Sequence, residues 1–303
     1  MPRSRRSDTA PAEGVLRRAR WAVEAAAVDV CLATIGRLSP RRRLSVGDAL
    51  GTLFWAVDAR HRRNAQRNIA LAFGGQLSPR DVRRLTLASM RHYTRVIVEA
   101  TAFRDFQADA VRVEGIEHLR TALDRGRGLL GFSAHFGHWE LLRFAAGYHG
   151  IPSFAIARPL ENPRLEKRLA NVRALGGNGI IAKHGAVSSA LKLLREGRFV
   201  AMMIDQRPEH SGVPVSFFGR RAFATDALAV LALRTGAPVV PGFAVLEPDG
   251  SWRVVIEPEV PIVASGDLRA DVQRVMTDCT AILEGWVRRY PEQWLWTHAK
   301  LKP

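Results

Sequence analysis

From Val111 onward, short apolar runs alternate with helical stretches, and this alternation restricts the fold more than any other feature of the chain. The predicted strands are 128–132, 152–157, 179–182, 199–204, 239–245 and 252–256. The predicted helices are 139–148, 163–175, 186–195, 226–235 and, closing the chain, 267–290. Short apolar strands that alternate with helices predict an α/β fold, in which a mostly parallel central sheet is flanked by helices. Asp249-Gly250 is a hairpin signal between the last two strands.

The part of the chain before this alternation has a different character. Residues 1–14 are predicted to be a disordered basic tail, 15–104 a helical region, and 105–303 an α/β domain that packs with it as one unit. Segment 15–36 is apolar but carries too many charged residues for a spanning helix. We therefore expect segment 15–36 to form an amphipathic helix that lies in a membrane interface. The alternative is a helix that simply packs on the domain.

The chain is strongly basic, with 45 Lys and Arg against 29 Asp and Glu and a net charge of +16. Such a charge attracts anionic membranes, phosphorylated lipids, acidic proteins or nucleic acid. Zinc-finger spacing, an RNP motif and a basic heptad region are all absent from the sequence, so nucleic acid is not an expected partner. Cys31 and Cys279 lie in predicted helical segments and indicate neither a disulfide framework nor a metal site.

A histidine and a carboxylate follow the predicted strand 128–132, in the stretch Ser133–Glu140. On one continuous helix, five residues correspond to a rotation of about 500°, so His135 and Glu140 would not share a face. The two side chains meet only if His135 precedes the helix, and Gly137 allows the sharp entry. We then expect His135 to act as a general base, oriented by Glu140. His138 is the rival histidine and is predicted to face elsewhere.

Two alternatives to acid–base catalysis are open on these residues and on the charge of the chain. A metal-dependent hydrolase would use His135, His138 and Glu140, but the H-x-x-H-x-E spacing lacks the i, i+4 histidine pair of helical zinc sites. We therefore expect no metal. A non-catalytic protein that binds anionic membranes or nucleic acid is the other alternative, because the net charge alone would allow it.

Several further stretches accompany the His135–Glu140 motif in a fixed order: 67–73 (RNIALAF), 157–163 (ARPLENP), 205–208 (DQRP), 215–219 (VSFFG), 234–241 (RTGAPVVP) and 291–296 (PEQWLW). With the H-x4-D/E motif, this set resembles the lysophospholipid acyltransferase superfamily. Within it, the chain is most similar to the lipid A lauroyl and myristoyl acyltransferases and to the phosphatidylinositol mannoside acyltransferases. The resemblance runs from about residue 15 to the end. The ending His298–Lys302 departs from the family's H-R-R-W-K, which leaves the acceptor open.

The resemblance implies a membrane-associated O-acyltransferase on the cytoplasmic face of the bacterial inner membrane. Such an enzyme moves a fatty acyl group from a thioester, on acyl carrier protein or coenzyme A, to a lipid hydroxyl. The thioester is a co-substrate, and no cofactor is expected. The implied acceptor is a phosphorylated glycolipid such as a lipid A precursor, with a phosphatidylinositol mannoside or another lysolipid as the alternative. The hydroxyl needs a base as it attacks, which is the role expected of His135.

Three residues in the matching blocks are expected to bind substrate: Arg158, Asp205 and Arg207. The guanidinium of Arg158, at the end of a predicted strand, suits a phosphate, although a surface arginine is the alternative. Asp205 follows the apolar run 199–204, and polar residues at carboxyl strand ends line the crevice of an open α/β sheet. It is expected beside His135 as a second carboxylate or in contact with substrate. A helix cap or a partner of Arg207 is the structural alternative.

Aromatic residues gather in the last two blocks. Trp294 and Trp296 are two positions apart, which predicts packing, with a membrane interface as the alternative beside Lys300 and Lys302. The stretch Phe217-Phe218-Gly219 is predicted to shape a loop or a wall of the acyl site rather than to perform chemistry.

Overall fold

The computed structural model describes residues 10–101, 111–157, 159–182, 185–206 and 212–297. Within these residues, a seven-stranded sheet has the order β1-β9-β8-β2-β5-β3-β4. Neighbours from β8 to β4 are parallel, whereas β9 runs antiparallel to β8 and carries β1 parallel to itself. The strands are β1 (Val111–Glu114), β2 (Leu129–Ser133), β3 (Ser153–Ala157), β4 (Gly179–Ala182), β5 (Phe199–Met203), β8 (Val239–Leu246) and β9 (Trp252–Ile256). The predicted mostly parallel sheet is confirmed.

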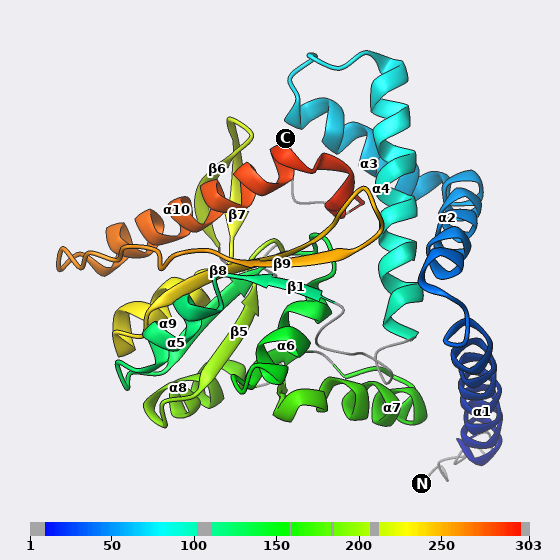
Figure 1. The fold of residues 1–303 in the computed structure, drawn as a ribbon, viewed down its shortest axis with the longest axis horizontal. Helices are drawn as coiled ribbons and strands as arrows, with labels where there is room; N and C mark the ends of the chain where they lie inside the picture. Colours follow the sequence, from blue (N-terminus) through cyan, green and yellow to red (C-terminus); the bar gives the residue numbers. More distant parts are fainter. Residues whose placement is uncertain (1–9, 102–110, 158, 183–184, 207–211, 298–303) are drawn as a thin grey trace, which may run out of the picture.

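Helices cover both faces of this sheet (Figure 1). They are α5 (Ile116–Leu123), α6 (Trp139–Tyr148), α7 (Pro163–Arg173), α8 (Ala186–Arg195), α9 (Ala227–Thr235) and α10 (Leu268–Arg289). Because successive strand residues point to opposite faces, Leu129 packs in a core with α5 and α6, and Leu130 in a core with α8, α9 and α10. Burial on both faces explains why the strands are continuous apolar runs rather than alternating ones.

Four helices precede the sheet: α1 (Ala10–Ile35), α2 (Pro40–Val57), α3 (Ala59–Ala72) and α4 (Pro79–Glu99). They lie together along one side of the molecule in Figure 1. The cap of α4 follows the sequence signal, with Pro79 in the first turn and Ser78 Oγ accepting a hydrogen bond from the Asp81 N–H at 3.2 Å. The first helix begins inside the segment predicted as a tail. The predicted boundary after residue 104 lies outside the described residues.

The helical region is tied to the far end of the chain by buried hydrogen bonds. The side chain of Asn68, on α3, donates to the carbonyl of Trp296 at 2.8 Å. The hydroxyl of Ser89, on α4, donates to the carbonyl of Trp294 at 2.6 Å. In the described part of the chain, none of the helices combines the length and the apolar character that a membrane span requires.

The two β-hairpins differ in how clearly the sequence predicts them. Asp249-Gly250 joins β8 to β9 as predicted, with Gly250 at a φ of 88°. The strands β6 (Val213–Phe217) and β7 (Arg220–Ala224) form a second, separate hairpin that was not predicted. Its turn has Phe218 and Gly219 at φ values of 54° and 67°. Phe in this left-handed region is rare, so the sequence carries no ordinary hairpin signal.

The two phenylalanines of this hairpin pack against the end of the chain. The rings of Phe217 and Trp294 are 5.4 Å apart, and those of Phe218 and Trp296 are 5.8 Å apart. Phe217 and Phe218 are therefore part of the core. Of the two predicted alternatives, the stretch forms a loop, the turn of this hairpin, rather than a wall of the acyl site.

Candidate active site

The sheet register places His135 beside Asp205. Strands β2 and β5 pair in parallel with Ser133 opposite Met203, and each candidate residue lies two positions beyond. One carboxylate oxygen of Asp205, Oδ2, accepts the backbone N–H of His135 at 2.8 Å. The other, Oδ1, lies 2.9 Å from the ring Nδ1. The Asp205 side chain is 0% exposed and the His135 side chain 16%, so the carboxylate is fully buried behind a ring that reaches the surface.

A sharp turn after β2 brings His135 to this position. Gly137 has a φ of 53°, and a Cβ built there would lie 1.5 Å from the carbonyl oxygen of Ala244. Only glycine fits this backbone. The helix α6 begins at Trp139, so His135 precedes the helix that carries Glu140, as the spacing predicted.

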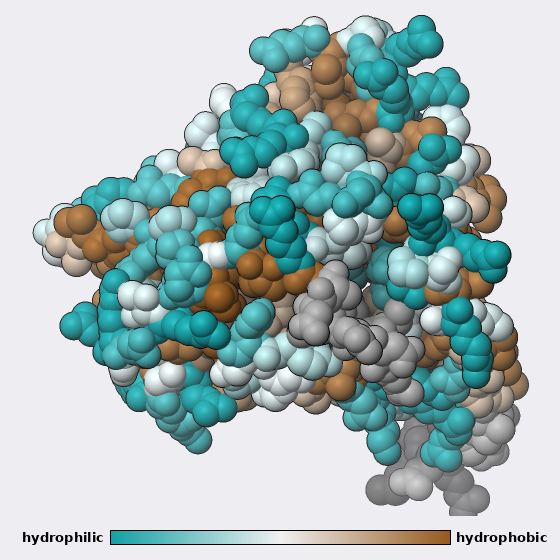
Figure 2. Space-filling model, in the orientation of Figure 1, coloured by the Kyte–Doolittle hydropathy of each residue, from teal (hydrophilic) through white to brown (hydrophobic). Residues whose placement is uncertain are grey.

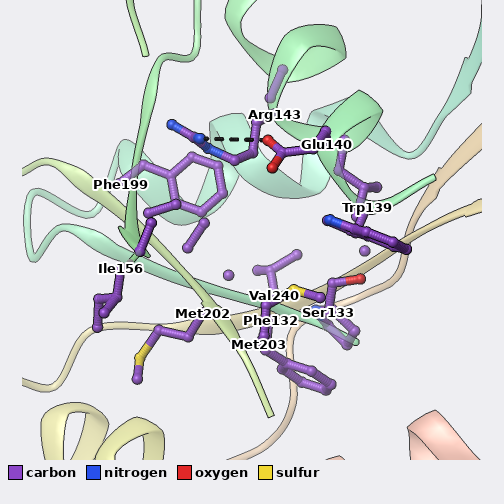
Figure 3. A pocket seen from close by; sticks show the side chains of 18 of the residues that line it. Phe132, Ser133, Trp139, Glu140, Arg143, Ile156, Phe199, Met202, Met203 and Val240 are labelled. Atoms are coloured by element: carbon purple, nitrogen blue, oxygen red, sulfur yellow. Dashed lines mark ion pairs between the residues drawn. The ribbon is translucent and has the colours of Figure 1, made fainter. Parts of the chain in front are cut away.

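Glu140 does not take the place predicted for it. Among the described residues, the carboxylate hydrogen-bonded to the His135 ring is Asp205, and Glu140 is bonded to arginine. The Nε–H of Arg173, on α7, donates to Glu140 Oε1 at 3.0 Å. The guanidinium of Arg143, one turn further along α6, lies 4.0 Å from Oε2 (Figure 3). The physical reason is that a permanently charged guanidinium stabilises an ionised carboxylate better than a neutral imidazole does.

Arg143 is itself largely buried and is satisfied by the sheet. It donates to the carbonyl of Gly179 at 2.7 Å and to Ser153. Burial lowers the pKa of Arg143 to about 10, and the negative charge of Glu140 opposes this effect. Glu140 thus compensates two guanidinium groups at the edge of α6 and α7.

His138 lies on the other side of the turn from His135. It is 1% exposed, and its ring packs edge-to-face against Trp252 at 5.0 Å between centroids. His92, on α4, approaches the same indole at 6.0 Å. Burial lowers the pKa of both histidines to about 3. They are neutral core residues at physiological pH. Over the described residues, no group of three or more His, Cys, Asp or Glu side chains is arranged to hold a metal ion.

A cavity of about 500 Å³ opens beside His135, between the sheet and α6. On the sheet side, the cavity is lined by five residues that lie side by side on neighbouring strands, here called the small-residue row: Val240, Gly131, Ala201, Ala155 and Ile180. Because these residues are mostly small, the row leaves space beneath the helix. Figure 3 shows Trp139, Ser133, Glu140, Arg143, Phe199 and Met203 around this space.

The remaining predicted residues divide into three groups. Arg158 and Arg207 lie outside the described residues. Asp205 was predicted either beside His135 or in contact with substrate; it lies beside His135, and its buried side chain offers no surface to a substrate. Trp294 and Trp296 are 1% and 0% exposed, so the membrane-interface alternative for them is wrong. The sequence reasoning missed Arg173, which carries no motif signal, and the contact of Trp294 with Asp205.

Comparisons with known proteins agree with the blocks in the sequence. The family model described as bacterial lipid A biosynthesis acyltransferase matches residues 16–303. The phosphatidylinositol mannoside acyltransferase of Mycolicibacterium smegmatis is 28% identical over 76% of this chain and 76% of its own length. The lipid A biosynthesis palmitoleoyltransferase of Escherichia coli is 26% identical over 85% of this chain and 84% of its own length. The chain is therefore an acyltransferase. It belongs to the bacterial lipid A biosynthesis acyltransferase family, which confirms the predicted resemblance.

The buried histidines predict that stability falls in mild acid. Unfolding returns each ring to a pKa of about 6.5, so below that pH the unfolded state binds more protons than the folded state. Between pH 7 and pH 5, the free energy of unfolding is expected to fall by about 2 kcal/mol for each histidine. Urea unfolding at both pH values measures this loss. In His138→Phe, the free energy of unfolding should fall clearly less between the two pH values than in wild type. His149→Phe, at an exposed position, is the control and should fall as much as wild type. Equal losses in wild type and His138→Phe would contradict the prediction.

Proposed function

We propose that the protein transfers a fatty acyl group from an acyl carrier protein or coenzyme A thioester to a hydroxyl of a phosphorylated glycolipid, with His135 as the general base. The observation that carries the proposal is the His135–Asp205 pair at the edge of an apolar cavity. The reaction needs a base for the acceptor hydroxyl and, next to it, an apolar space for the acyl chain. The co-substrate is the thioester, and the proposed chemistry needs no further cofactor.

In the proposed reaction, Asp205 accepts a hydrogen bond from the Nδ1–H of His135, which leaves Nε2 as the basic nitrogen. Nε2 removes the proton of the acceptor hydroxyl as its oxygen attacks the thioester carbonyl carbon. The tetrahedral intermediate collapses by breaking the carbon–sulfur bond, and the imidazolium returns its proton to the departing thiolate. The buried carboxylate of Asp205 stabilises the imidazolium formed between these steps.

Glu140 has a different part in this proposal from the one that the motif predicted. It holds Arg173 and Arg143, and both arginines line the cavity. Guanidinium groups suit the phosphates of either substrate. Glu140 would thus act on the reaction by positioning the arginines rather than by orienting the ring.

The cavity supports an acyl chain as its occupant. Its walls are mainly aliphatic and aromatic, and His135 lies at one edge of it. A chain that enters along the small-residue row would leave its carboxyl end near the base. Burial of methylene groups contributes roughly 0.8 kcal/mol each, which favours a long chain over a short one.

The acceptor is proposed from the relatives. One is named for phosphatidylinositol mannoside and another for lipid A biosynthesis, and both names denote glycolipid acceptors. A lipid A precursor is the proposed acceptor, with a phosphatidylinositol mannoside as the alternative. Mass spectrometry of lipids from cells with and without the active protein separates them, because only the true acceptor loses an acyl chain.

We also infer that the protein works on the cytoplasmic face of the inner membrane, through α1 and α2. On α1, Leu16, Val23 and Val30 recur every seven residues and are 71%, 70% and 63% exposed. On α2, Leu53 and Val57 are 58% and 70% exposed. Apolar side chains lie among hydrophilic ones along this edge in Figure 2. Apolar faces flanked by arginine bind anionic membrane surfaces without spanning them.

The first prediction of this proposal concerns the base and its partner. His135→Ala is expected to lower kcat by at least about 10³-fold, and Asp205→Asn by about 10²-fold or more, with the fold intact by circular dichroism. The double variant should be no slower than His135→Ala, because the two residues act as one unit. Acyl transfer from a radiolabelled thioester measures these rates. Near-wild-type turnover in a folded His135→Ala variant would refute the mechanism.

The second prediction concerns the cavity. Ala201→Leu adds bulk to the middle of the small-residue row and should reduce kcat/KM for long-chain thioesters about tenfold more than for short-chain ones. Ala281→Leu makes the same change at an exposed position of α10 and should change neither value. If Ala201→Leu lowers both values equally, the acyl chain does not occupy this cavity.

The third prediction concerns the membrane. The protein should float with vesicles that contain anionic phospholipid and release as salt is raised. Val57→Glu should weaken this binding several-fold. Val263→Glu, at a 69% exposed position in the segment between β9 and α10, is the matched control. This segment lies on the opposite side of Figure 1 from α2. Equal binding by the two variants would exclude α2 from the membrane contact.

A further inference from the structure

The loop that carries His135 is held by the end of the chain. The N–H of Gly137 donates to the carbonyl of Gln293 at 2.8 Å, and the N–H of Leu295 donates to the carbonyl of His135 at 3.0 Å. The two backbones thereby form a short antiparallel bridge. The loop position therefore depends on a segment more than 150 residues away in sequence.

One side chain of this segment reaches the catalytic pair itself. The indole Nε1–H of Trp294 donates to Oδ2 of Asp205 at 3.1 Å. Oδ2 is the same oxygen that accepts the backbone N–H of His135 at 2.8 Å, while Oδ1 faces the ring Nδ1. Trp294 and Asp205 are each 1% exposed, so solvent does not replace the indole donor.

We propose that Trp294 is a positioning residue of the acyl-transfer site, which holds the Asp205 carboxylate in the orientation that bonds His135. The inference rests on the proposed function, in which His135 is the base. Two donors on Oδ2 fix the rotation of the carboxylate about its Cβ–Cγ bond, and this rotation directs Oδ1 at the imidazole. An indole is suited to the task because it offers one donor on a large, rigid ring that the core holds in place.

The orientation of the Asp205 carboxylate matters most when positive charge develops on the His135 ring. As His135 takes the hydroxyl proton, the new imidazolium is stabilised by a carboxylate that is already aimed at it and needs no reorganisation. Without the indole donor, the carboxylate keeps its two bonds to His135 but is held less firmly, and the base would be misaligned for part of the time. The loss should therefore fall on kcat rather than on KM, since Trp294 does not line the cavity.

The chain supplies a matched control in Trp296. This residue is equally buried, and its indole N–H donates to the carbonyl of Pro291 rather than to the catalytic pair. The rings of Trp294 and Trp296 also touch, at 4.7 Å between centroids. Phe at either position removes the same atoms from the same aromatic cluster, but only one of the two substitutions removes a donor from Asp205.

Two measurements test the proposal. Trp294→Phe should lower kcat about tenfold with KM unchanged, whereas Trp296→Phe should leave kcat within about twofold of wild type. Equal loss of kcat in the two variants would overturn it. If Trp294→Phe does not fold, NMR of ¹⁵N-tryptophan-labelled protein decides. The indole N–H signal of Trp294 should shift in Asp205→Asn, and the same signal should still be present in Trp296→Phe. Indole signals that are all unchanged by Asp205→Asn would also overturn it. An active, folded His135→Ala variant would instead refute the proposed function.

Discussion

The buried carboxylate of Asp205 is the constraint on which the rest of this site depends. Removing an ionised carboxylate from water costs several kcal/mol unless hydrogen-bond donors replace the solvent. Among the described residues, the donors include the backbone and ring of His135 and the indole of Trp294. They come from the end of β2 and from the end of the chain. These three hydrogen bonds form together only when the β2–β5 pairing and the docking of the C-terminal segment are both complete, which couples folding to the assembly of the site.

The sequence predicted the parts of the fold that are encoded locally. Strands buried on both faces appear as apolar runs, and the helices between them have caps, so the alternating α/β order was readable. The short strand β1, the helix α5 and the β6–β7 hairpin were missed. The hairpin has Pro214 within one strand, Arg220 and Arg221 in the other, and Phe218 in its turn. Its stability comes from contacts with α10 and the terminal tryptophans, and a local pattern does not contain those contacts.

The site was predictable to the same degree and for the same reason. The strand-end positions of His135 and Asp205 follow from apolar runs that stop at a polar residue, and parallel pairing brings such ends together. The partner of Glu140 was not predictable, because sequence spacing restricts neighbours on one helix and says nothing of Arg173 on another. Trp294 had the spacing of a packing residue. It is one, and its single polar atom nevertheless bonds the acid of the catalytic pair.

The same register governs both the proposed base and the cavity. Gly131 is opposite Ala201 in the sheet, and His135 and Asp205 lie four residues further along the same two strands. At about 3.3 Å per residue, roughly 13 Å separates the small-residue row from the base. A slip of one residue between β2 and β5 would turn one strand's small residue away from the cavity and would separate the imidazole from its carboxylate. A single set of strand hydrogen bonds therefore fixes the space for a chain and the position of the group that would act at its end.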